Sequence, residues 1–103
     1  MNDGNPIATE VIFEDERVRV WRQLIKSNET LGRHTHDNDY VLINIEGTGP
    51  LEVEFHDGTG GELGSSLTLN PKRGEAFLVP SGHCETARNL GDDYHAILVE
   101  FKR

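Results

Sequence analysis

Residues 28–47 read NETLGRHTHDNDYVLINIEG, and this stretch decides the fold. It holds a His-x-His pair, His34 and His36, which is followed closely by the apolar run of residues 40–45 and by Gly47. Side chains alternate between the two faces of an extended chain, so both imidazoles point to the same face. Two imidazoles that share a face can chelate a metal ion. The stretch therefore predicts a β-structure built around a metal site.

A second informative stretch, GEAFLVPSGHCETARN, covers residues 74–89. Gly74 and the Pro-Ser-Gly sequence at residues 80–82 enclose an apolar run, and Glu85 follows them. Glycine and proline mark turns because of their special backbone conformations. We therefore expect a strand, a tight turn and a further strand here.

Apolar residues recur at period two along most of the chain, which is typical of strands. Leucine, valine and phenylalanine alternate with glutamate over residues 51–55, an Asp-Gly hairpin signal follows at residues 57–58, and residues 66–69 provide the return strand. Turn signals every ten residues or so indicate an antiparallel sandwich or barrel. Residues 7–16 could hold a strand or a single turn.

Two runs, residues 40–45 and 95–101, are apolar on both faces. Strands of this kind usually lie between two packed layers. The whole chain of 103 residues is short enough to form one domain. We expect residues 1–103 to be that domain, with residues 1–8 mobile.

The two stretches resemble the two conserved motifs of a small single-domain cupin. The first motif runs from a glycine through His-x-His and a glutamate to a second glycine. Asn28 stands in the first glycine slot, and asparagine tolerates the left-handed backbone that such a slot requires. In the second motif Gly74, Pro80, Gly82 and Asn89 match in register. The resemblance implies an all-β fold, a double-stranded β-helix (jelly-roll) barrel of two antiparallel sheets, often a homodimer, with a site in its mouth.

The chain departs from the usual cupin ligand set of three histidines and one glutamate. The glutamate slot of the first motif falls on Tyr40 or Val41, and the last histidine slot falls on Glu85. The resemblance, with this exchange, implies a metal site of His34, His36 and Glu85. Two imidazoles and one carboxylate suit a divalent transition metal such as Fe, Mn, Zn or Ni. The alternative is a metal-free cupin in which these residues hydrogen-bond one another or a ligand.

Three further side chains are candidates for lining the pocket. Tyr40 shares the parity of the two histidines, and it either orients a substrate or is a core tyrosine whose hydroxyl finds a partner. Asn44 lies in the interior register of an apolar strand, where a buried amide needs partners. His83 shares the parity of Glu85 if the chain is already extended after Gly82.

Two more candidates depend on which face of a strand they occupy. His95 could point inside, either as a core histidine or as a ligand. Arg22 could share an inward face with the valines of its strand and bind a carboxylate substrate bidentately, or it could be exposed. Trp21, on the other face of that strand, is then predicted to pack under a dimer partner.

Composition excludes several kinds of partner. The chain has 18 acidic and 10 basic residues, a net charge of −8, and no basic stripe that would neutralise phosphates, so we expect no nucleic-acid binding. The acidity disfavours anionic membrane surfaces, and no apolar run approaches the ~20 residues that span a bilayer. The N-terminus has no signal-peptide features, and Cys84 is the single cysteine. We expect a cytoplasmic protein.

Two functions of different classes fit these observations. The first is a small metal-dependent enzyme, a dioxygenase or an isomerase acting on a small polar metabolite, in which the ion is a Lewis acid or activates O₂. The second is a non-catalytic module that binds a small ligand or a metal in the same pocket. The fold alone does not choose between them.

Overall fold

The computed structural model describes residues 5–102, which form nine strands and one short 3-10 helix. In chain order these elements are β1 (Glu10–Glu14), β2 (Val18–Ile25), β3 (Thr30–Thr35), β4 (Tyr40–Glu46), β5 (Leu51–Phe55), η1 (Gly61–Leu63), β6 (Ser66–Leu69), β7 (Ala76–Val79), β8 (Cys84–Asn89) and β9 (Tyr94–Phe101). The open question at residues 7–16 is answered by a strand, β1.

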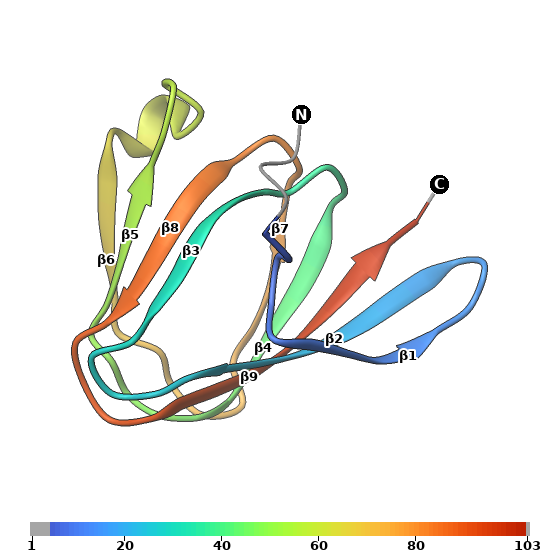
Figure 1. The fold of residues 1–103 in the computed structure, drawn as a ribbon, viewed down its shortest axis with the longest axis horizontal. Coiled ribbons are helices and arrows are strands. Elements are labelled where there is room, and N and C mark those ends of the chain that lie inside the picture. The colour runs from blue at the N-terminus through green and yellow to red at the C-terminus, as the bar shows by residue number, and fades with distance from the viewer. Residues whose placement is uncertain (1–4, 103) are drawn as a thin grey trace.

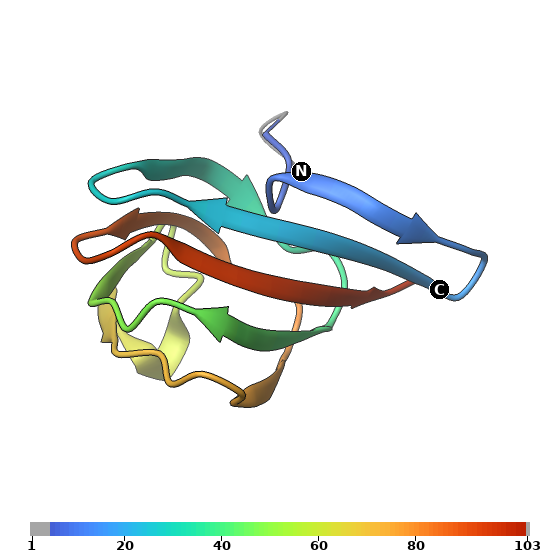
Figure 2. The ribbon, with the colours of Figure 1, turned by 90° about the horizontal axis from the view of Figure 1, so that it is seen from below.

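The strands form two antiparallel sheets. One sheet has the order β1-β2-β9-β4-β7 and the other the order β3-β8-β5-β6. Figure 1 shows the two sheets facing each other, and Figure 2 shows the long strands β2 and β9 running side by side in the first of them. The predicted all-β jelly roll of two antiparallel sheets is confirmed.

Strand β5 shows how the alternating pattern builds the core. Its residues Leu51, Val53 and Phe55 are buried, and the glutamates between them are exposed. Leu51 pairs with Leu69 and Val53 with Leu67 of β6, so the return strand lies where the pattern predicts it. Burying these apolar side chains between the sheets is the main favourable term for the fold.

Positive backbone φ angles occur where the sequence requires them. Asn28 has a φ of 66°, so it fills the glycine slot of the first motif in the left-handed region. Gly47, with a φ of 94°, also has no room for a side chain, because a Cβ there would lie 2.7 Å from the backbone oxygen of Asp93. Asp57 and Gly58 both have positive φ, as the central residues of a type I′ turn require, and the connection then continues through η1 to β6.

The expectation that residues 1–8 are mobile is wrong at the end of that segment. Ile7 and Ala8 are 6% and 0% exposed, and they pack in one cluster with Tyr40 and Leu98. Two apolar side chains in a core cluster hold the chain in place, because their release would expose them to water. Residues 1–4 lie outside the described residues.

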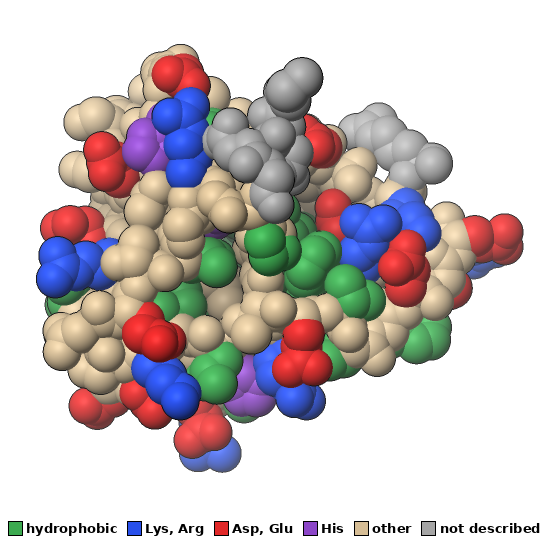
Figure 3. All heavy atoms as spheres, viewed as in Figure 1, with side chains coloured by type: hydrophobic (Ala, Val, Ile, Leu, Met, Phe, Trp, Pro, Cys, Tyr) green, Lys and Arg blue, Asp and Glu red, His purple; other side chains and the backbone are tan. Residues whose placement is uncertain are grey.

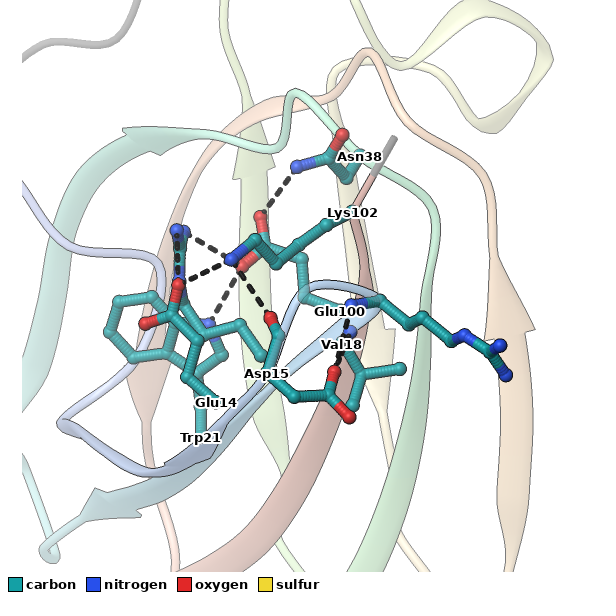
Figure 4. A network of polar contacts seen from close by, with 9 residues as sticks. Glu14, Asp15, Val18, Trp21, Asn38, Glu100 and Lys102 are labelled. Carbon is teal, nitrogen blue, oxygen red and sulfur yellow. Dashed lines mark hydrogen bonds and ion pairs between the residues drawn. The ribbon is translucent and has the colours of Figure 1, made fainter.

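Trp21 lies on the inner face of β2 and packs against this same cluster. Its indole N–H donates a hydrogen bond to the Glu100 carboxylate at 2.9 Å, and Glu100 is only 5% exposed. Asn38 donates to the other carboxylate oxygen at 2.9 Å, and Arg19 forms an ion pair with the group at 3.4 Å (Figure 4). The prediction that Trp21 packs under a dimer partner is wrong, because the indole is part of the chain's own interior.

The outer face of the five-stranded sheet carries a row of apolar side chains. Consecutive strands pair Phe13 with Val20, Val20 with Val99, Val99 with Val41 and Val41 with Leu78. The two ends of the row, Phe13 and Leu78, are 54% and 69% exposed. These ends lie on β1 and β7, and the outward-facing residues Val41 of β4 and Val99 of β9 between them are only partly buried.

Charged side chains of both signs are scattered over the molecular face seen in Figure 3, which shows no basic stripe. Within the described part of the chain, the structure contains no helix with the length and apolar character needed to span a membrane.

Candidate metal centre

Pairing between β3 and β8 places the predicted metal ligands together. His34 on β3 lies directly opposite Glu85 on β8 in the sheet register. His36 continues the line of β3, because its backbone exchanges hydrogen bonds with the oxygen of His83 and the N–H of Gly82 at 3.0 and 2.8 Å. His34 and His36 are 1% and 2% exposed, and the Glu85 side chain is 12% exposed. All three side chains therefore lie inside the barrel.

The ligand atoms converge. The Nε2 atoms of His34 and His36 lie 3.1 Å apart, and Oε1 of Glu85 lies 3.4 and 3.3 Å from them. Ligand atoms bound at about 2.1 Å to one ion, with angles between about 90° and 109°, lie about 3.0–3.4 Å from one another. The separations within this trio fit a single small ion.

Hydrogen bonding prepares His34 to be a ligand. Its Nδ1 lies 2.8 Å from the backbone oxygen of Gly32, which can only accept, so Nδ1 carries the proton and Nε2 presents a lone pair. Nδ1 of His36 is buried and has no hydrogen-bond partner among residues 5–102. With a lone pair on His34, the short Nε2–Nε2 contact requires either a proton on His36 or a shared cation between the rings.

The Glu85 carboxylate is held in its charged form. Burial alone raises its pKa, but hydrogen bonds and electrostatic attraction from the protonated forms of His34 and His36 outweigh burial and lower the pKa to about 2. The group is therefore an anion at neutral pH, which is the form that binds a cation.

Tyr40 forms one wall of this centre. Its ring stacks on the His36 ring with centroids 4.4 Å apart, and the side chain is buried. Burial first, and then the charge of Glu85, raise the pKa of Tyr40 far above its usual value of 10.0. The hydroxyl is therefore a neutral donor beside the histidines and is a poor metal ligand.

We predict that the two tyrosines of this chain resist ionisation. Burial raises the pKa of Tyr94 to about 12 and that of Tyr40 further. Because the folded protein disfavours the phenolate, the stability that comes from the neutral phenols is complete below pH 10 and is lost as the pH rises through the folded pKa values. The ultraviolet absorbance of phenolate should stay flat to about pH 11 and then rise together with unfolding. Urea-denatured protein, the control, should titrate near pH 10; the same midpoint in folded protein would contradict the prediction.

A cavity of about 290 Å³ lies between the sheets beside the three ligand atoms. The predicted pocket residues Tyr40, Asn44 and His83 all line it. The Asn44 side-chain oxygen accepts a hydrogen bond from the Tyr94 hydroxyl at 2.5 Å, and the His83 ring packs edge-on against Phe55 with centroids 5.1 Å apart. These three side chains are therefore placed to contact a small molecule bound next to the centre.

The predictions for Arg22 and His95 as pocket residues are wrong. Arg22 is exposed on the outer face of β2, where its guanidinium lies 3.7 Å from Glu10. His95 lies on the outer face of β9 in a shallow depression shared with Arg22 and Glu46. Both strands carry apolar residues on each face, so the pattern does not decide which face is inside. The bulky Trp21 and its inward-facing neighbours occupy the interior, which turns Arg22 outward.

Sequence reasoning missed one polar residue that lines the cavity. Gln23 is 8% exposed and lines the cavity. The sequence does indicate its burial, because Gln23 alternates with Trp21 and Ile25, whose side chains are large and apolar, and so shares their face of the strand. Asp39 accepts a hydrogen bond from the Ser81 backbone N–H at 2.8 Å, which holds the Pro-Ser-Gly turn against the start of β4.

Solved structures resemble this chain closely. A cupin domain from Bordetella pertussis Tohama I shares 27% identity with it, over 91% of this chain and 91% of that chain, with a TM-score of 0.79. An RmlC-like cupin family protein with a double-stranded β-helix fold from Methanocaldococcus jannaschii shares 19% identity with it, over 97% of this chain and 84% of that chain, with a TM-score of 0.69. KdgF from Halomonas sp. shares 20% identity with it, over 91% of this chain and 78% of that chain, with a TM-score of 0.61.

No protein-family model matches the chain, and no curated protein does. The likeness to solved cupin structures confirms the predicted double-stranded β-helix fold.

Proposed function

We propose that this chain, which has the fold of a small cupin, binds a divalent transition metal ion between His34, His36 and Glu85 and uses it on a small metabolite. The observation that carries the proposal is the convergence of two imidazole nitrogens and one carboxylate oxygen, 3.1 to 3.4 Å apart, at the wall of a cavity. The charged state of the carboxylate supports it further.

The donor set suits the chemistry of a dioxygenase or an isomerase. Two histidines and one carboxylate leave coordination positions open, and Fe(II), Mn, Zn and Ni all accept such ligands. The bound ion would supply Lewis acidity or a site for O₂. Glu85 would supply negative charge, the neutral Tyr40 hydroxyl would donate to an oxygen atom of the ligand, and the barrel would keep bulk water away.

The alternative is a binding module without turnover. The hydrogen-bond distances within the trio favour it, because one proton shared among His34, His36 and Glu85 would satisfy these groups without an ion. In that case the same cavity would hold a small ligand, and no metal would be needed.

Elemental analysis separates the two functions. Protein purified without chelator should contain close to one equivalent of a transition metal, and anomalous scattering should locate it between the three ligand atoms. Substrate-dependent O₂ uptake by that protein would support the dioxygenase. Failure to bind Fe(II), Mn, Zn or Ni under any loading condition would remove the metal-dependent enzyme and leave the binding module.

We predict that Glu85→His retains metal binding but changes metal preference. Carboxylate ligands suit Mn, whereas imidazole suits Zn and Ni, so the affinity for Mn should fall about ten-fold relative to that for Zn. Competition titrations on the variant and on Glu75→His, a control at another part of the cavity wall, measure the ratio. If Glu85→His created metal binding that the natural protein lacks, Glu85 would not be a ligand.

The homodimer and the cytoplasmic location stay predictions. The apolar row that ends at Phe13 and Leu78 supports the homodimer, because pairing with a second copy would cover it. A small molecule remains the proposed partner of the cavity.

A further inference from the structure

The walls of the cavity are mostly apolar. Leucine, isoleucine, valine, phenylalanine and alanine side chains from both sheets make up the larger part of its lining, which includes Leu42, Val53, Phe55 and Leu98. Within residues 5–102, no arginine or lysine lines it. An anionic group bound deep in this cavity would lose its hydration without gaining a cationic partner, and it would face the carboxylates of Glu75 and Glu85. The cavity therefore disfavours an anionic molecular body.

Two side-chain amides lie at the end of the cavity away from the histidines. Gln23 on β2 and Asn44 on β4 both pair with Ala96 of β9, so they flank this small residue on the inner face of the sheet. Asn44 follows Tyr40 by four residues on the same strand, which places it about 13 Å from the histidine end. The cavity thus has one polar pole at the histidines and another at these amides.

The amide of Gln23 is free to bind a ligand. The side chain is 8% exposed and lines the cavity, and among residues 5–102 its amide makes no hydrogen bond. Asn44 has its oxygen occupied by the Tyr94 hydroxyl, which turns its NH₂ group toward other partners. The free amide atoms of Gln23 and Asn44 are accessible from the cavity, so a ligand oxygen can accept the hydrogen bonds that water would otherwise accept there.

We propose that the cavity binds a neutral, mainly apolar molecule whose carbonyl or hydroxyl oxygen is held by Gln23 and Asn44. The proposal rests on the proposed function in one respect: both place the ligand in the same cavity. An engineered cavity of about 150 Å³ binds benzene, so about 290 Å³ admits a molecule of roughly a dozen non-hydrogen atoms. This class differs from the small polar metabolite that the sequence alone predicts.

Three probes of equal skeleton test the class. Benzylacetone carries a ketone, butylbenzene replaces the ketone oxygen by hydrogens, and hydrocinnamate carries a carboxylate. Calorimetric titration of chelator-treated protein at about pH 8, above the usual histidine pKa, should give the tightest binding for benzylacetone and about hundred-fold weaker binding for hydrocinnamate. Equal affinity for the ketone and the carboxylate, or no binding of benzylacetone, would overturn the proposal.

The variant Gln23→Met tests the residue. It keeps an unbranched side chain of similar length, so benzylacetone should bind about five-fold more weakly and butylbenzene equally well. Arg22→Met, on the exposed face of the same strand, is the matched control and should change neither. An unchanged affinity of Gln23→Met for the ketone would overturn the assignment. If the variant does not fold, the side-chain amide resonances of Gln23 in the natural protein decide, because they must shift on addition of benzylacetone.

The two proposals fail separately. Protein that binds benzylacetone in chelator but takes up no metal removes the metal-dependent function alone. Protein that takes up metal but does not bind the ketone removes the apolar ligand alone.

Discussion

Replacing His36 by alanine is expected to lower the affinity for the transition metal about 100-fold or more. The variant loses one of three ligand atoms, and even removing a group that only supports a ligand costs 10-fold to 100-fold. The remaining Nε2 of His34 and carboxylate of Glu85 make a site with two protein ligands. Titration with Zn and Fe(II), followed by elemental analysis after gel filtration, measures the loss.

The control for this variant is His56→Ala. His56 lies outside the cavity and its Nε2 contacts the Thr86 hydroxyl at 2.8 Å, so its removal should leave metal occupancy unchanged. Circular dichroism must show that both variants keep the β-fold, because His36 also packs on Tyr40. Full occupancy in a folded His36→Ala protein would show that the ligand assignment is wrong.

Replacing Asn89 by alanine is expected to lower the free energy of unfolding by about 3 kcal/mol or more. Asn89 is 0% exposed, and its side chain donates to the backbone oxygens of Ile25 and Asp92 at 2.8 and 2.6 Å. Its oxygen accepts from the Gly91 N–H at 2.9 Å. The alanine variant leaves three backbone groups without this partner, and each costs about 1 kcal/mol or more.

Urea denaturation measures this loss, and thermal unfolding should show a midpoint lower by about 15 °C. Asn70→Ala, at an exposed asparagine, should stay within about 0.5 kcal/mol of the natural protein. Asn89→Asp should be at least as destabilised as the alanine variant, since a carboxylate cannot donate to the two carbonyls. A stable Asn89→Ala protein would mean that water replaces the amide, and that Asn89 is not essential for joining these turns.

Local signals predicted the parts of the fold that depend on backbone conformation and alternation. Asn28 occupies the left-handed region because the turn there leaves few other choices, and asparagine shows that requirement in the sequence. Strand β5 was predictable because its two faces differ sharply in polarity. The parity of His34 and His36, together with the match of Glu85 to a known motif position, placed all three in one site.

The failures come from strands whose two faces are alike. In β2 and β9 both faces carry apolar residues, so the inward face is chosen by the size and fit of the opposing side chains rather than by polarity. The inward alternatives for Arg22 and His95 could therefore not be excluded, and the buried Gln23 was missed. The packing of Ile7 and Ala8 was also unpredictable locally, because it depends on where the N-terminal segment crosses a barrel formed by distant residues.

Direct pairing of His34 with Glu85 across β3 and β8 also fixes the order in which the centre is assembled. The two histidines are neighbours in sequence, but the carboxylate arrives only when a segment some fifty residues later docks beside them. Until the barrel closes, the chain therefore holds only two of the three proposed ligands together. By mass action, an ion that binds only the closed barrel would stabilise the folded state, and the free energy of unfolding would rise with the free metal concentration.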